Sequence, residues 1–311
     1  MAAGKSVPEL SKGFLGVGIL YSWFGLAALA AAICLASMQF LLARMGEFAL
    51  DVPNHRSLHE TPVPRTGGWA IWSGVFFALL LGPASWDFGV VVAFASLLAV
   101  SVADDLRSLP ARARFVVQLF AVSSLVLTLL PGLSWWLLPL LVVGGVWVVN
   151  LYNFMDGMDG FAASMTVIGC ITLALVCASR EYWDLAGICI VVAAAALVFL
   201  YYNWPIARIF MGDAGSTSLG LAVFGVSLYG CSRGAFQPLI PLVVFSPFWL
   251  DATFTLLRRV FAGERWWEAH RQHVYQRLAL KFGVKKALVG EICVMLGTAS
   301  AALILVVCDV A

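Results

Sequence analysis

Long runs of apolar residues constrain this chain more than any other feature of its sequence. Of its 311 residues, 62% are hydrophobic and only 12% are charged, and the charges fall in short stretches between the runs. A bilayer core about 30 Å thick is crossed by a helix of about 20 apolar residues, and lipid leaves an open-ended chain no other way to cross. The sequence therefore predicts an all-α fold, a polytopic transmembrane helical bundle that forms a single domain over residues 1–311.

The runs predict about ten membrane spans. The first run is too long for a cleavable signal sequence, so we expect it to remain in the protein. The division between 134 and 179 depends on one polar stretch, from Asn150 to Gly160. The predicted spans cover residues 14–43, 67–83, 87–103, 114–131, 134–151, 160–179, 184–203, 214–231, 237–258 and 287–309.

The basic residues predict the orientation of these spans. With ten spans, the loops 44–66, 104–113, 152–159, 204–213 and 259–286 share one face of the membrane, and this face carries 15 of the 19 basic residues. Basic loops are retained in the cytoplasm, so we expect this face to be cytoplasmic and both termini to lie on the other side. The 15 residues are Arg44, Arg56, Arg65, Arg107, Arg112, Arg114, Arg208, Arg258, Arg259, Arg265, Arg271, Arg277, Lys281, Lys285 and Lys286.

The same face carries polar residues that are costly beside lipid, among them the adjacent carboxylates Asp104 and Asp105. Two neighbouring carboxylates at low water content repel each other unless a cation or an arginine neutralises them, which favours a metal-binding or proton-handling role. The alternative is a pair that caps the next helix, or that matches Arg107 and Arg112 as solvated ions. The pair alone does not decide between these interpretations.

A second motif, Asn153-Phe-Met-Asp156-Gly-Met-Asp159-Gly160, spaces an amide and two carboxylates three residues apart. This spacing stacks side chains on one face of a helix, and glycine lets the backbone turn or approach a ligand closely. An Asx turn or a helix cap needs only one such residue, whereas this stretch has four when Asn150 is included. We therefore favour a functional site here.

A third motif places Asp213 at a helix start, with Gly212 and Gly215 beside it and Asn203 upstream. The carboxylate is a plain N-cap or, together with Asn153, an oxygen ligand of Mg²⁺. This ion needs only one or two such groups and completes its shell with water and substrate phosphates. The backbone N–H groups at the same helix start are suited to a pyrophosphate.

The longest basic loop contains His270-Arg271-Gln-His273. No second pair of suitable spacing completes a zinc site, and the arginine between the histidines favours an anionic ligand such as a pyrophosphate. The alternative is an amphipathic segment whose basic residues meet anionic lipid headgroups. That alternative accounts for Lys281, Lys285 and Lys286.

Five motifs in this order resemble the polyprenyl-phosphate N-acetylhexosamine-1-phosphate transferases, a glycosyltransferase family 4 type. This family includes the phospho-N-acetylmuramoyl-pentapeptide translocase and the undecaprenyl-phosphate GlcNAc-1-phosphate transferases. Where the muramoyl-peptide translocases carry three histidines in a row, this chain has His-Arg-Gln-His, so the resemblance favours the O-antigen initiating enzymes, with GlcNAc, FucNAc or QuiNAc as the sugar. The motifs are Asp51-Val-Pro-Asn-His-Arg-Ser-Leu-His59, Asp104-Asp105-Leu, Asn153 to Gly160, Phe210-Met-Gly-Asp213-Ala-Gly-Ser216 and His270-Arg-Gln-His273.

The resemblance implies a multi-pass enzyme of the bacterial inner membrane whose Mg²⁺-dependent site, with Mn²⁺ as the alternative ion, faces the cytoplasm. The enzyme would transfer an N-acetylhexosamine 1-phosphate from a UDP-sugar to undecaprenyl phosphate, release UMP, and so initiate O-antigen (lipopolysaccharide) or a related cell-wall glycan. A homodimer is compatible with the resemblance, and no nucleic-acid partner is expected. The implied metal ligands are Asp213 and Asn153, the implied catalytic residues are Asp104, Asp105, Asp156, Asp159, His270 and His273, and the implied substrate-binding residues are Asn54, His59, Arg112, Asn150, Asn203 and Arg271.

The chemistry of such a transfer makes the same demands on its own. Both substrates are anions, so a divalent cation and arginine must neutralise the developing charge while the reacting groups are held in line. We expect Asp104 or Asp105 to orient or deprotonate the lipid phosphate, and the sequence leaves direct attack and a phospho-aspartate intermediate open.

Two rival functions remain from other classes. A secondary transporter would place polar groups near mid-span, whereas here they lie almost wholly at one face, with Asp251 the main exception. A CDP-alcohol phosphotransferase would carry a spaced aspartate signature, which is missing from this sequence.

Overall fold

The computed structural model describes residues 7–46, 48–53, 58, 60–83, 86–264 and 270–308, and nearly all of this part of the chain is helical. Two short strands pair antiparallel between the first two helices, with Leu50 opposite Pro64. The elements are α1 (Val7–Arg44), β1 (Leu50–Asp51), β2 (Val63–Pro64), α2 (Gly67–Leu80), α3 (Phe88–Arg107), α4 (Ala111–Leu129), α5 (Leu138–Met155), α6 (Phe161–Ser179), α7 (Trp183–Asn203), α8 (Gly212–Ser232), α9 (Leu239–Val244), α10 (Ser246–Phe261), α11 (Val274–Phe282) and α12 (Val284–Val307).

Eight helices in the described part are long and apolar enough to cross a membrane, namely α1, α3, α4, α5, α6, α7, α8 and α12. The prediction of a polytopic helical bundle is thereby confirmed, while the count of ten spans stays a prediction. The expected span 67–83 forms the 14-residue helix α2. At 1.5 Å per residue this helix is only about 21 Å long, which is shorter than the core of a bilayer.

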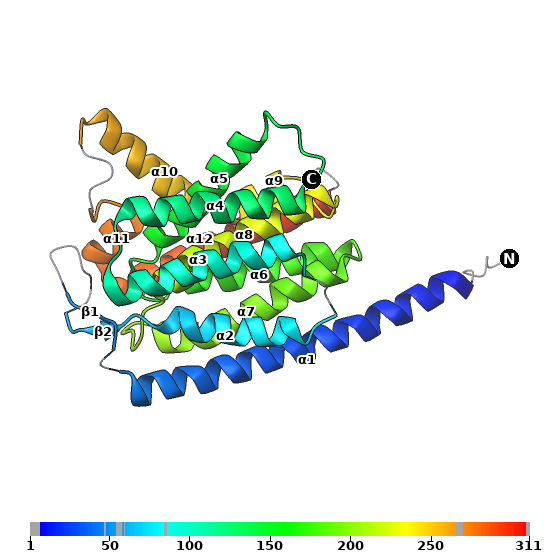
Figure 1. Cartoon of the computed structure of the whole chain (residues 1–311), viewed down its shortest axis with the longest axis horizontal. Helices are drawn as coiled ribbons and strands as arrows, with labels where there is room; N and C mark the ends of the chain where they lie inside the picture. The colour runs from blue at the N-terminus through cyan, green and yellow to red at the C-terminus, as the bar shows by residue number, and fades with distance from the viewer. Residues whose placement is uncertain are drawn as a thin grey trace.

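The expected span 237–258 is divided into α9 and α10 at Phe245. Pro247 lies in the first turn of α10, where its missing N–H and fixed φ are tolerated, but it cannot continue a helix from the preceding turn. The prediction of one continuous span was therefore wrong at this point. The break allows α10 to leave the bundle at an angle and project beyond its neighbours (Figure 1).

Two apolar clusters hold the bundle together. The larger joins α1, α2, α6, α7 and α12, and in it Trp23, Phe199 and Leu288 are fully buried. The smaller joins α3, α4, α5 and α8 around Leu97, Val122 and their neighbours. Since α8 contacts both groups of helices, its position is fixed from two sides.

The helices alternate in direction, so one end of the bundle collects the C-terminal ends of α1, α3, α5 and α7 and the N-terminal ends of α2, α4, α6 and α8 (Figure 1). The strands and α11 lie at this same end, whereas α1 begins and α12 ends toward the other. The motifs identified in the sequence therefore lie at one end of the molecule.

Candidate active site

The N-terminus of α8 forms the centre of the site. Asp105, from the last turn of α3, lies across it: the N–H of Asp213 donates to Oδ1 at 2.8 Å and the N–H of Ala214 donates to Oδ2 at 3.1 Å. The first N–H groups of a helix have no acceptors within it. Here the carboxylate of Asp105, a residue that is only 1% exposed, accepts the hydrogen bonds of two of them. These two groups are thus occupied by the protein rather than open to a pyrophosphate, and Asp105 holds in place the backbone that carries Asp213.

Arg114, in the first turns of α4, connects two carboxylates. Its Nη1 donates to Oδ2 of Asp104 at 3.0 Å and to Oδ2 of Asp213 at 2.8 Å. Hydrogen bonds between charged groups are stronger than neutral ones. Asp104 also accepts a hydrogen bond from the N–H of Leu109. One cation therefore holds together acidic groups from α3 and α8.

Arg114 is a site residue that the sequence interpretation missed, because it favoured Arg112. Arg112 is exposed, and its side chain makes no hydrogen bond within the described residues. Arg114, Gln118 and Val122 are four residues apart and so share one face of α4, and the structure shows that both Gln118 and Val122 are buried. This pattern indicates that Arg114 also faces the bundle.

Close packing of α2 against α8 fixes the start of α8. A Cβ atom on Gly68 would lie 2.2 Å from the backbone N of Gly215, so only glycine fits there. The N–H of Gly68 donates to the carbonyl of Met211 at 2.8 Å. Nearby, Nη2 of Arg65 donates to the carbonyl of Asp105 at 2.8 Å. The segment before α2 is thereby connected to both halves of the carboxylate cluster.

The last turn of α5 and the loop that follows it bring two further candidate residues to this cluster. Oδ1 of Asn153 accepts a hydrogen bond from Oγ of Ser216 at 3.4 Å, in the first turns of α8. The carboxylate of Asp156 has no hydrogen bond within the described part of the chain. Burial, followed by the neighbouring carboxylates of Asp213 and Asp105, raises the pKa of Asp156 well above its usual range.

Asp159 and Asn203 connect loops to each other. Oδ2 of Asp159 accepts from the N–H of Ala207 at 2.9 Å. Asn203 is only 3% exposed; its Oδ1 accepts from the N–H of Gly160 at 2.8 Å and its Nδ2 donates to the carbonyl of Ile209 at 2.9 Å. Both ends of the Asn203 amide are therefore bonded within the protein, and this side chain joins the segment before α6 to the segment before α8.

Asn150 lies one turn before Asn153 on α5. Its Nδ2 donates to Oε1 of Gln118 at 2.8 Å and so joins α5 to α4. Two other expected substrate-binding residues, Asn54 and His59, lie outside the described residues.

The histidine motif approaches the same loop from α11. His273 is 4% exposed, and its Nδ1 lies 3.3 Å from Oδ1 of Asp251 in α10. The hydroxyl of Tyr275 donates to the carbonyl of Phe154 at 2.9 Å. This bond joins the start of α11 to the last turn of α5. The Asp213 motif, through Ser216, and the histidine motif, through His273, therefore both contact the segment Asn153–Gly160.

His270 and Arg271 are more open. The ring of His270 lies 4.8 Å from that of His273, and burial, then His273 and Arg259, lowers the pKa of His270 to about 4. Arg271 is exposed at the surface. A neutral imidazole and an exposed guanidinium are both available to an anionic ligand.

Asp213 and Asn153 fit a Mg²⁺ site of the open kind. Asp213 lies in the first turn of α8, and Oδ1 of Asn153 reaches the same helix through its hydrogen bond from Ser216. No group of three or more His, Cys, Asp and Glu side chains in the described part of the chain converges as a metal site. Water and substrate phosphates would therefore complete the shell, which is how Mg²⁺ is commonly bound.

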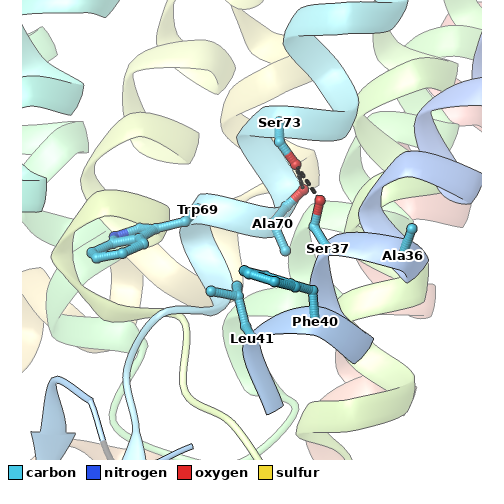
Figure 2. A pocket seen from close by; sticks show the side chains of 7 residues that line it. All are labelled: Ala36, Ser37, Phe40, Leu41, Trp69, Ala70 and Ser73. Atoms are coloured by element: carbon cyan, nitrogen blue, oxygen red, sulfur yellow. Dashed lines mark hydrogen bonds between the residues drawn. The ribbon is translucent and has the colours of Figure 1, made fainter. Parts of the chain in front are cut away.

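A groove of about 340 Å³ lies elsewhere, between α1 and α2 (Figure 2). Of its seven lining residues, the only hydroxyl-bearing ones are Ser37 and Ser73, which bond to each other at 2.9 Å. No ionisable side chain lines it, so we assign it no part in the chemistry.

The chain matches known proteins over most of its length. Residues 88–231 match the model of glycosyl transferase family 4. The probable undecaprenyl-phosphate N-acetylglucosaminyl 1-phosphate transferase of Bacillus subtilis is 31% identical over 76% of this chain and 71% of its own. The decaprenyl-phosphate N-acetylglucosaminephosphotransferase of Mycobacterium tuberculosis is 31% identical over 89% of this chain and 80% of its own. The undecaprenyl-phosphate alpha-N-acetylglucosaminyl 1-phosphate transferase of Escherichia coli K12 is 25% identical over 73% of this chain and 68% of its own.

The match to the family model spans α3 and the start of α8, whose carboxylates meet at Arg114. The chain therefore belongs to glycosyl transferase family 4, the membrane enzymes that transfer a sugar 1-phosphate to a polyprenyl phosphate.

Proposed function

We propose that this protein transfers N-acetylglucosamine 1-phosphate from UDP-N-acetylglucosamine to a polyprenyl phosphate and releases UMP, as the first membrane step of a cell-envelope glycan. The names of the relatives support the sugar and the class of lipid acceptor. One observation carries the proposal: Asp105 and Asp213, 108 positions apart in the sequence, meet at the start of α8 beside Asp104 and Arg114.

Asp213 and Asn153 would hold Mg²⁺, which when bound would neutralise the charge of the donor's pyrophosphate. Arg114 is the residue of the chain best placed to bind a phosphate oxygen, because its guanidinium lies between Asp104 and Asp213. Asp104 then orients Arg114, and Asp105 holds Asp213 through the backbone of α8. Asp104 and Asp105 therefore have different roles, although the sequence predicted the same role for either of them.

The acceptor lipid reaches this end of the bundle along apolar helix surfaces. Leu250, Phe254 and Leu257 of α10 are 52%, 65% and 50% exposed, on the helix that leaves the bundle close to α5 (Figure 1). Such a surface is suited to an isoprenoid chain, since burying apolar area stabilises the complex.

The site would face the cytoplasm, with both termini on the other side of a bacterial inner membrane. The excess of basic residues in the loops at this end supports that orientation. UDP-sugars are cytoplasmic donors, so the same face must carry the nucleotide site.

The test is release of UMP by the purified protein with undecaprenyl phosphate, Mg²⁺ and a panel of UDP-N-acetylhexosamines. We expect turnover with UDP-N-acetylglucosamine and none with Asp213→Asn. The matched control is Asp184→Asn, the same change at an exposed aspartate in the first turn of α7, which should keep full activity. Near-normal turnover of Asp213→Asn would remove the metal assignment, and preference for another sugar would correct the donor.

A further inference from the structure

Asp251 is a carboxylate inside α10 with four hydrogen bonds. Its Oδ1 accepts from the N–H of Val274 at 2.9 Å and from Oγ1 of Thr255 at 3.1 Å, and its Oδ2 accepts from the N–H of Tyr275 at 3.0 Å. The fourth partner is Nδ1 of His273, at 3.3 Å from Oδ1. The Asp251 side chain is only 8% exposed, and its one ion-pair partner in the described part of the chain is this imidazole.

The contact with Asp251 determines how the imidazole of His273 is presented. An ionised carboxylate only accepts hydrogen bonds, so the ring nitrogen that faces it must donate. With the proton on Nδ1, the other ring nitrogen, Nε2, points away from Asp251. The ring plane is also held, because it stacks on Phe154 at 6.4 Å and on Tyr275 at 5.8 Å between ring centroids.

We propose that Asp251 is a positioning residue for the transfer reaction, which fixes the orientation and tautomer of His273 so that Nε2 is presented to the phosphates of the donor. The inference rests on the proposed function, since it takes the histidine motif as part of the pyrophosphate site. A carboxylate that holds one nitrogen of an imidazole so that the other can act is a recurring arrangement at functional histidines.

The competing role for Asp251 is purely structural. It also accepts from the first two N–H groups of α11, so its loss would loosen that helix whatever His273 does. Gln276 separates the two roles. Its Oε1 accepts from the N–H of His273 at 3.3 Å, as one half of a capping box whose other half pairs the Gln276 backbone with the His273 side chain. Gln276→Ala removes only the Oε1 half and keeps the Asp251–imidazole contact, so it is the matched control for a loosened start of α11.

The first measurement is the ¹⁵N spectrum of the full-length protein in detergent, with all four histidines labelled and His273→Ala used to assign the signal. At alkaline pH we expect the Nδ1-protonated tautomer of His273 in the wild type, a mixture of tautomers in Asp251→Asn, and no change in Gln276→Ala. A wild-type His273 protonated on Nε2 would overturn the proposal without any variant and independently of any activity.

The second measurement is a double-mutant cycle on UMP release. We expect Asp251→Asn to lower kcat about 10- to 100-fold, the usual cost of removing a carboxylate behind a functional histidine, with little change in KM for the lipid. Asp251→Asn in a His273→Ala background should then cost almost nothing further. If the two losses multiply instead, Asp251 acts through the helix cap and the positioning role is wrong. Failure of the transfer reaction itself would appear as an inactive wild type, with the tautomer result unaffected.

Discussion

Replacement of Arg114 tests the electrostatic balance of the site most directly. Its Nη1 lies 3.0 Å from Oδ2 of Asp104 and 2.8 Å from Oδ2 of Asp213. The two carboxylate oxygens are therefore at most about 6 Å apart, and unit charges at that separation repel by about 3 kcal/mol at an effective dielectric constant of about 20. Arg114→Gln removes the cation that offsets this repulsion, so we expect kcat/KM for UMP release to fall at least about 100-fold, since 1.4 kcal/mol corresponds to about tenfold.

The same geometry predicts that Arg114→Lys keeps most of the activity. Only Nη1 bridges the carboxylates, while Nε of Arg114 is buried without a partner among the described residues, so the site uses the arginine as a single charge rather than as a bidentate fork. Both variants would be compared by UMP release across a Mg²⁺ titration. Equal activity of Arg114→Gln and wild type, or equal inactivity of the lysine and glutamine variants, would refute the reasoning.

Three further predictions concern the support of the site. Gly68→Ala should destabilise the protein by about 1–3 kcal/mol through overpacking, because the new Cβ would lie 2.2 Å from the backbone N of Gly215. Gly144→Ala is the control and should not destabilise the protein, because a Cβ there would meet nothing within 4 Å. Equal melting temperatures of the two variants in detergent would contradict this prediction. The pKa of His270 is lowered from 6.5 to about 4 in the folded protein. Between pH 6.5 and about 4, His270 therefore binds a proton in the unfolded chain but not in the folded one, so the stability of the fold falls as the pH drops through this range. His270→Gln should flatten that decline in a series of melting curves, and an unchanged slope would count against it. Asn203→Ala should lose about 1–3 kcal/mol for each of two orphaned buried backbone groups; unchanged stability with lost turnover would instead indicate direct contact with substrate.

Hydropathy predicted the helical membrane fold well, because burial in lipid is a property of each residue and its immediate neighbours. Each of the eight long apolar helices overlaps one of the predicted spans, and most of them extend past its ends. The prediction of a continuous span failed at residues 237–258, where the chain forms two helices. Pro247 lies in the first turn of α10, just after α9 ends, inside a stretch that was predicted as one span. The average hydropathy of that stretch does not reveal the break.

The sequence also indicated which motifs hold the site residues, but it could not assign their roles. Asp104 and Asp105 are adjacent and chemically identical, yet on a helix they point about 100° apart, and so one reaches Arg114 while the other reaches the backbone of α8. Asn203 was expected to meet substrate and is instead engaged on both sides by protein.

By itself, then, the sequence determined that the chain crosses a membrane as helices and that its acidic and amide groups lie at one end of them. Only the tertiary structure decided that Arg114 rather than Arg112 enters the cluster, and that Asp251 holds His273. The physical reason is that hydrogen bonds depend on the relative rotation and register of helices far apart in the chain. Packing such as the contact between Gly68 and Gly215 sets these quantities, and no local pattern encodes them.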